Sequence, residues 1–191
     1  MFSFNEILKN KNVLEFYFAG KSPGIMAYHG GAIEKGTEQI ARAIISHGFA
    51  GYIVSVRVRN NHWSFHVGSQ HIKPNDSEKL RTFISCVDSA IAIHGQARDN
   101  NIYVGGLNTE LRCKIAEALS EEFLGVVSDL KKIPSNLRGI SKINIVNKPE
   151  YKGVQIELPK NLRVSDENYD KPADWNGKKI CNAILKAITT G

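Results

Sequence analysis

Hydrophobic and polar positions follow two different periods along this chain. Short runs rich in β-branched and aromatic residues are typical of strands, whereas apolar residues spaced three and four apart are typical of helices. The predicted strands are residues 13–18, 24–28, 51–58, 88–93, 101–104, 125–128 and 154–158, and the predicted helices are residues 36–47, 76–85, 109–123 and 175–189. Because the two patterns alternate, the sequence predicts an α/β fold with a mixed, mainly parallel β-sheet flanked by helices.

Local signals mark some of the boundaries. The helix at 36–47 has Thr37 in a position to cap its beginning and Gly48 in a position to end it. Residues 131–148 include Pro134 and Gly139 and read as a long loop, and long loops in compact domains are often functional. No internal repeat or linker divides the 191 residues, so we expect a single domain over 1–191.

Cysteine content and hydropathy bear on the expected location. Cys86, Cys113 and Cys181 are odd in number and far apart, as expected for reduced thiols in a cytoplasmic protein. Cys113 and Cys181 lie in helical patterns, which favours core or half-buried packing. The first residues do not resemble a signal peptide, and no window approaches about 18 uninterrupted apolar residues, so we expect no membrane segment.

The net charge is +6 and the isoelectric point is near 9.2, which favours a polyanionic partner. The basic residues are scattered, however, and the only adjacent pairs are Lys131-Lys132 and Lys178-Lys179. This scatter argues against a nucleic-acid surface. A solvated basic surface without a partner, and a non-catalytic module that contacts phosphates, both stay open.

Three segments place a metal-binding or proton-transfer side chain at the end of a predicted strand. These side chains are His29 with the nearby Glu34, then His94, and then Glu157. Two histidines and a carboxylate are enough to hold a catalytic zinc with water in its open position, and a further glutamate can accept a proton from that water. The predicted ligands are therefore His29, Glu34 and His94, with Glu157 as the base.

Each of these residues also has a structural explanation. Glu34 could stabilise the beginning of the following helix, where acidic residues are favourable, and a lone histidine at a strand end is usually not a ligand. His66 and His71 are secondary candidates as proton donors or oxyanion partners, although surface placement explains both equally well.

Taken together, the segments resemble one known family, the poly-γ-glutamate hydrolases of phages and bacteria, whose fold is similar to that of the zinc carboxypeptidases. The matching blocks are residues 29–41 (HGGAIEKGTEQIA), 65–69 (FHVGS), 93–95 (IHG), 103–108 (YVGGLN), 136–139 (NLRG), 143–148 (INIVNK) and 153–163 (GVQIELPKNLR).

The resemblance implies one zinc per chain, held by His29, Glu34 and His94, and Glu157 acting as base and then as acid. It also implies cleavage of amide bonds between glutamates that are joined through their side-chain carboxylates. The positive net charge agrees with such an anionic substrate.

The matching blocks also suggest substrate contacts. Arg163, Asn147 and Lys148 would bind substrate carboxylates, because a guanidinium suits bidentate contact with a carboxylate. A related alternative keeps the zinc chemistry but replaces the polymer with peptidoglycan or another γ-glutamyl peptide.

Overall fold

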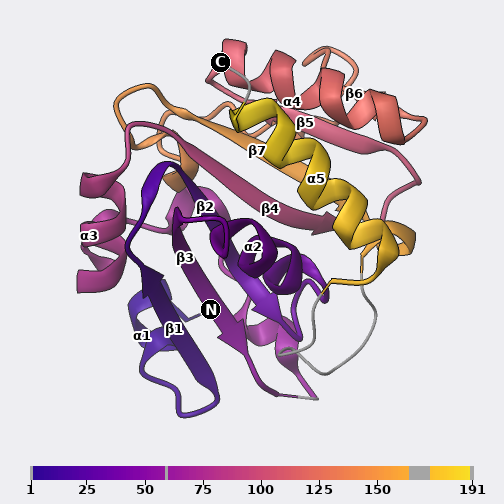
Figure 1. Ribbon diagram of the computed structural model, residues 1–191. Coiled ribbons are helices and arrows are strands. Elements are labelled where there is room, and N and C mark those ends of the chain that lie inside the picture. Colours follow the sequence, from indigo (N-terminus) through magenta and orange to yellow (C-terminus); the bar gives the residue numbers. More distant parts are fainter. Residues whose placement is uncertain (1, 59, 164–172, 190–191) are drawn as a thin grey trace.

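The computed structural model describes residues 2–58, 60–163 and 173–189 and contains one seven-stranded β-sheet (Figure 1). The strands are β1 (Val13–Phe18), β2 (Lys21–Gly31), β3 (Phe49–Val56), β4 (Ala90–Gln96), β5 (Ile102–Gly106), β6 (Val126–Val127) and β7 (Gly153–Pro159). Their order in the sheet is β1-β3-β2-β4-β7-β5-β6. The β1–β3 and β5–β7 pairs are antiparallel and the other four pairs are parallel, so the predicted mixed, mainly parallel sheet is confirmed.

Five helices accompany the sheet in the described part of the chain. They are α1 (Phe4–Leu8), α2 (Thr37–Ile45), α3 (Glu78–Cys86), α4 (Thr109–Glu122) and α5 (Trp175–Thr189). Helices α2, α4 and α5 cover one face of the sheet, while α1 and α3 lie on the opposite face beside β1 and β3 (Figure 1). The four α-helices expected from periodicity are all present.

Alternation along the strands builds two separate cores, because successive side chains in a strand point to opposite faces. In β2, Ile25 packs against the α2, α4 and α5 layer, and Met26 belongs to the core on the α1 and α3 side. On this second face, the central strands β4 and β7 are covered by loops, including the 3₁₀ turn Ile145–Asn147. The second face therefore has room for a cleft over the middle of the sheet.

Several boundaries differ from the sequence prediction. Helix α1 was not expected; Ser3 and Glu6 begin it with a capping box, in which each side chain accepts from the other's backbone amide. Strand β2 starts at Lys21, earlier than predicted. The N-cap of α2 is Gly36 in a left-handed conformation, so Thr37 is not the cap; its hydroxyl donates instead to the carbonyl of Glu34. The loop at 131–148 is confirmed and contains two 3₁₀ turns, Ser135–Leu137 and Ile145–Asn147.

The cysteines differ in their exposure. Cys181 is buried as expected, but Cys113 is exposed, because it lies on the solvent side of α4.

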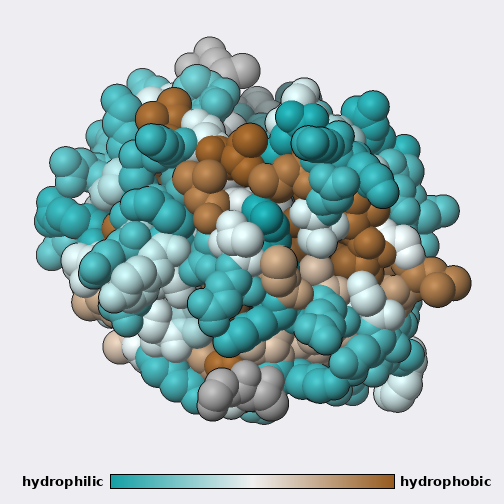
Figure 2. All heavy atoms as spheres, turned by 90° about the horizontal axis from the view of Figure 1, so that it is seen from above, coloured by the Kyte–Doolittle hydropathy of each residue, from teal (hydrophilic) through white to brown (hydrophobic). Residues whose placement is uncertain are grey.

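The face seen from above is mostly hydrophilic, with apolar side chains showing in a band between the polar ones (Figure 2). Among the described residues, no helix combines the length and the apolar character that crossing a membrane requires.

Candidate active site

Three side chains of the site are positioned by parallel strands at the middle of the sheet. His29, His94 and Glu157 are each the third residue from the end of β2, β4 and β7. His94 and Glu157 are direct partners in the β4–β7 register, so their side chains lie on the same face. The expected convergence at the carboxyl ends of parallel strands is thus present in the fold.

A β-bulge brings two consecutive residues of β2 to this face. Between Ala27 and Gly30 the register against β3 shifts by one residue, which places Tyr28 and His29 within the irregularity. Both rings lie about 5 Å from the ring of His94, with centroid distances of 4.8 Å for Tyr28 and 5.1 Å for His29. In a regular strand the two would point to opposite faces, so the bulge is what directs them together.

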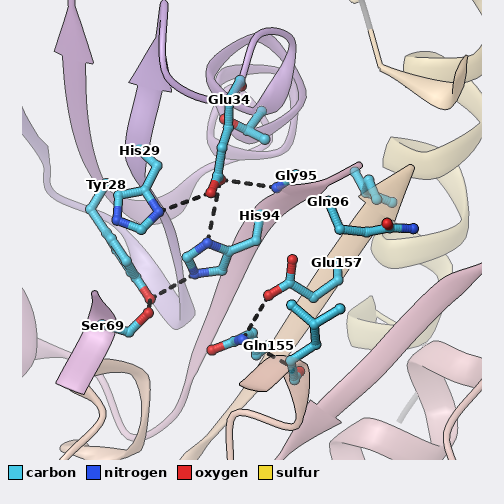
Figure 3. A network of polar contacts seen from close by, with 12 residues as sticks. Tyr28, His29, Glu34, Ser69, His94, Gly95, Gln96, Gln155 and Glu157 are labelled. Atoms are coloured by element: carbon cyan, nitrogen blue, oxygen red, sulfur yellow. Dashed lines mark hydrogen bonds and ion pairs between the residues drawn. The ribbon is translucent and has the colours of Figure 1, made fainter. Parts of the chain in front are cut away.

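Glu34 returns to the same point from the loop that follows β2. Gly31 has a positive φ of 70° and lies against the backbone of Val56, where a side chain would not fit, so the chain turns tightly there. The carboxylate of Glu34 reaches the Nδ1 atoms of His29 at 3.0 Å and of His94 at 3.3 Å (Figure 3). It also accepts the backbone N–H of Gly95 at 2.9 Å. Glu34 therefore contacts both histidines and does not cap α2.

Outer hydrogen bonds fix the ring nitrogens of both histidines. Nε2 of His29 lies 2.8 Å from the carbonyl of Val67, which can only accept, so this nitrogen carries the proton. Nε2 of His94 lies 2.7 Å from the hydroxyl of Tyr28, which itself donates to Ser69 Oγ at 2.9 Å. His94 then donates to Tyr28, and the Nδ1 atoms of both rings are directed at Glu34.

The three side chains form a group with the composition and spacing of a metal site. His29, Glu34 and His94 are all buried, and their ligand atoms lie within 4.8 Å of one another. Two imidazoles and a carboxylate suit zinc and other transition metals, and hydrogen bonds that orient the outer nitrogen of each ring are typical of ligating histidines. The donor set therefore fits a metal ion with at least one open position.

Charge interactions within this group are strong. Burial acts to raise the pKa of Glu34, but the two facing histidines outweigh it, so the pKa of this carboxyl lies well below its usual value. Burial acts to lower the pKa of His94, yet the Glu34 carboxylate holds it above the usual value. Such a concentration of perturbed groups in a cleft is typical of functional sites.

Glu157 and His66 lie beside this group. Glu157 is 4% exposed and accepts a hydrogen bond at 2.8 Å from Gln155, while burial raises the pKa of its carboxyl. The ring of His66 lies 4.3 Å from that of His29, and burial together with the nearby His29 lowers the pKa of His66 to about 4. His66 is therefore uncharged at neutral pH, whereas the exposed His71 does not line the cleft.

These residues open into a cavity of about 490 Å³. One wall is formed by the strand ends, and two further walls are formed by loops. The loop residues are Trp63, His66, Gly68, Ser69 and Gln70 from one side and Ser135, Asn136, Leu137, Gly139, Ile140, Ser141 and Asn144 from the other. Among the described lining residues there is no lysine or arginine. The loop walls therefore offer hydroxyl, amide, imidazole and apolar contacts.

Arg163 lies outside this cavity. Its guanidinium donates to the carbonyls of Lys35 at 2.9 Å, Leu158 at 3.2 Å and Gln96 at 3.4 Å. It also packs against Gly95, where a side chain would collide with it. The expected contact with a substrate carboxylate does not agree with this placement, because Arg163 joins three backbone segments behind the site.

The other two expected substrate contacts are also placed elsewhere. Asn147 is buried, and its amide group bonds four backbone groups, two as donor and two as acceptor. Lys148 is exposed, and its ammonium group donates to the carbonyl of Lys142. Neither residue lines the cavity. Asn147 fixes the conformation of the loop that forms one wall.

Sequence reasoning did not identify Tyr28, Gln155 and Asn144 as part of the site. A signal was available for Gln155, because Gln155 and Glu157 are polar residues two apart in the otherwise apolar strand β7, which places them on one face. Tyr28 shares the face of Met26, two residues before it, but its contact with His94 depends on the pairing of β2 with β4, which no local pattern indicates.

Comparison with known proteins adds relatives in sequence and in structure. The chain is 29% identical over 161 residues to the SPbeta prophage-derived protein YoqZ of Bacillus subtilis (strain 168), which covers 82% of this chain and 56% of that protein. This chain spans 56% to 65% of the length of the curated relatives that it matches.

Solved structures show the same fold. Zinc-free YndL superposes with a TM-score of 0.81 at 22% identity over 94% of this chain and 90% of that one. A bacteriophage poly-gamma-glutamate hydrolase gives 0.78 at 24% identity, with 93% and 88% covered. A metallo-carboxypeptidase from Burkholderia cenocepacia gives 0.52 at 14% identity, with 96% and 66% covered, so the expected likeness to carboxypeptidases is confirmed.

A family model described as poly-gamma-glutamate hydrolase matches residues 6–178, which includes every strand of the sheet and all the residues that meet in the cleft. The match covers most of the chain and agrees with the resemblance read from the sequence blocks. This chain therefore belongs to the poly-gamma-glutamate hydrolase family.

Proposed function

We propose that this protein is a zinc-dependent amidohydrolase that cleaves γ-glutamyl amide bonds, with poly-γ-glutamate as its substrate. The observation that supports this most is the meeting of His29, Glu34, His94 and Glu157 at one end of a cleft. A non-catalytic module that binds phosphates would need none of these buried groups.

The proposed roles follow from the contacts. His29 and His94 would hold the metal through Nδ1, and Glu34 through its carboxylate, while Val67 and Tyr28 keep the two rings oriented. Bound zinc supplies a Lewis acid that polarises the carbonyl and lowers the pKa of water to about 7.

Glu157 is the proposed general base. It is buried and lies on the same face as His94, and its carboxylate takes a proton from the attacking water and then gives it to the leaving nitrogen. His66 is neutral at pH 7, so it serves as a hydrogen-bond donor to the substrate carbonyl rather than as a charged acid.

Substrate contacts are proposed for the loop walls. A γ-linked polymer carries one free carboxylate per residue, and Ser135, Asn136 and Ser141 offer neutral donors along the cleft. The net charge of +6 would attract a polyanion at long range and raise its rate of association. Arg163 would contribute to the site by stabilising the backbone behind it.

The function is tested by metal content and substrate range. Protein purified without chelator should contain close to one zinc per chain, and His94→Ala should lose most of it, because two remaining ligands hold the ion weakly. Poly-γ-glutamate, poly-α-glutamate and a peptidoglycan stem peptide are then offered under the same conditions.

The outcomes separate the parts of the proposal. Cleavage of the γ-linked polymer alone supports it in full. Cleavage of the stem peptide alone would keep the zinc chemistry and overturn the substrate. A metal-free wild type that still cleaves any of the three would overturn the mechanism.

A further inference from the structure

The carboxylate of Glu157 is held by a hydrogen-bonded chain of two buried amides. Asn144 Nδ2 donates to Gln155 Oε1 at 2.9 Å. Gln155 Nε2 in turn donates to Glu157 Oε1 at 2.8 Å (Figure 3). Asn144 and Gln155 are 5% and 4% exposed. Buried polar groups with fixed partners orient one another strongly.

The direction of this chain is determined by its first member. The Oδ1 atom of Asn144 accepts the backbone N–H of Val146, as the N-cap of the 3₁₀ turn Ile145–Asn147. Its amide nitrogen is therefore the end that faces Gln155. Gln155 must then present its oxygen to Asn144, which leaves its NH₂ group to face Glu157.

Packing prevents the Gln155 amide from turning over. Its second N–H reaches the carbonyl of Leu137, at the limiting distance of 3.5 Å. Gly139, at a positive φ of 63°, lies so close to the Gln155 side chain that a residue with a Cβ would collide with it. Two segments of one loop thus hold the amide in place.

This arrangement has a consequence for the proposed base. Gln155 is the hydrogen-bond donor to the Glu157 carboxylate among the described residues, and it occupies Oε1 alone. The other oxygen is left for the cleft, which Glu157 lines. A donor on one oxygen fixes the orientation of the carboxylate, and with it the direction of the second oxygen.

We infer that Gln155 is a positioning residue for catalysis: locked by Asn144, it holds Glu157 with one carboxylate oxygen directed at the attacking water. This inference rests on the proposed role of Glu157 as the base. It makes the loop at 131–148, which carries Asn144, part of the catalytic machinery as well as a wall of the cleft.

The central test is a double-mutant cycle. Gln155→Met keeps the shape of the side chain and removes the donor, and kcat should fall by about 10-fold to 100-fold with KM and zinc content unchanged. In a Glu157→Gln background the same change should cost nothing further, because Gln155 acts only through Glu157. A structural role would instead give equal losses in both backgrounds.

A second variant tests the direction of the chain. Asn144→Asp preserves the N-cap, since aspartate caps as well as asparagine, but it cannot donate to Gln155. The carboxylate of the new side chain then faces Gln155 Oε1 with no proton between the two oxygens, so the amide is no longer held in place and kcat should fall as in Gln155→Met. This variant keeps the inference testable if the methionine variant fails to fold.

A matched control is available in β4. Gln96 is 5% exposed, also lies near the end of a central strand, and bonds the backbone of Arg98, Asp99 and Asn101 instead of Glu157. Gln96→Met should lower the melting temperature by a similar amount and leave kcat near wild type.

The possible failures are distinguishable. If Glu157→Gln alone leaves kcat unchanged, the proposed base is wrong. If Glu157→Gln lowers kcat but Gln155→Met and Asn144→Asp do not, or if their losses appear in KM or add to that of Glu157→Gln, the positioning role is wrong and the base stands.

Discussion

The strand wall and the loop walls of the cleft differ in how their side chains are held. On the strand wall, to which Glu34 is added from the turn directly after β2, the side chains of His29, Glu34, His94 and Glu157 are 3% to 6% exposed. Each has at least one hydrogen-bond partner. On the loop walls, Trp63 is 61% exposed and Ile140 is 39% exposed. The difference agrees with the proposed function, in which the fixed, buried groups carry the chemistry and the exposed side chains of the loops contact the substrate.

The largest expected effect comes from removing the proposed base on the strand wall. Glu157→Gln keeps the size of the side chain but cannot accept a proton, so kcat should fall by about 10²-fold or more. Zinc content should stay near one per chain, because Glu157 is not in the ligand group. If the variant kept its activity, the strand wall would not supply the base, and His66, which also lines the cleft, would be the next candidate.

A smaller effect is expected from a partner behind the strand wall. Tyr28→Phe removes the hydroxyl that orients His94, and loss of such a partner typically costs about 10-fold to 100-fold in metal affinity or activity. Competition with a zinc-binding dye measures the affinity.

Tyr52→Phe is the control, because Tyr52 is also a buried tyrosine, with its hydroxyl bonded to Glu15 at 2.7 Å. Its zinc affinity should match that of wild type. Equal loss in both variants would mean that general destabilisation, and not orientation of His94, explains the result.

A substitution in the loop walls should change KM and leave kcat nearly unchanged. The exposed indole of Trp63 lies at the cleft beside His66, with ring centroids 5.7 Å apart, and offers a flat surface to the methylene groups of a glutamate polymer. Trp63→Ala should cost about 1 to 2 kcal/mol of binding, which is about 5-fold to 30-fold in KM. Steady-state kinetics on poly-γ-glutamate separate the two parameters.

Trp175 supplies the matched control, since it is 71% exposed at the beginning of α5 and does not line the cleft. Trp175→Ala should leave both parameters unchanged. A fall in kcat without a change in KM for Trp63→Ala would contradict the division between the two kinds of wall.

The smallest effect concerns the layer behind the strand wall and should leave activity unchanged. Burial raises the pKa of the Cys181 thiol to about 12, so this group stays protonated and unreactive at pH 8, whereas Cys86 and Cys113 are exposed. A thiol reagent should label two cysteines quickly and Cys181 only on unfolding. Trp63→Ala should not change this count; faster labelling of Cys181 would show that the loop wall and the sheet are not independent.

Much of the fold could be predicted because its signals are local. The apolar stripe of α2 and the β-branched runs of the central strands depend on neighbours three, four or two residues away. Helix α1 was missed because it has only five residues, and its capping box is a weaker signal than periodicity. The cap of α2 was misplaced by one residue, because Gly36 occupies the N-cap in a left-handed conformation and the helix begins without a side-chain cap.

The site was predictable in part, because three of its residues lie at the ends of predicted strands. His29, His94 and Glu157 could be placed together because the ends of parallel strands meet at one edge, which is a property of the topology. Arg163 was assigned to the substrate because it lies in a block that resembles the family and because a guanidinium suits contact with a carboxylate. In the structure three of its N–H groups donate to the carbonyls of Lys35, Gln96 and Leu158. Lys35 and Gln96 are far from Arg163 in the sequence, so no local pattern indicates these contacts.

The sequence by itself determined the alternation of strands and helices, the family and the side chains able to hold a metal and move a proton, because these depend on residue type and short spacing. Only the tertiary structure decided how those side chains are oriented. The bulge that directs Tyr28 and His29 together, and the amides of Asn144 and Gln155 that hold Glu157, arise from contacts between strands and loops far apart in the chain. These long-range hydrogen bonds and the packing around them set the orientation of the side chains. Neither leaves a periodic pattern in the sequence.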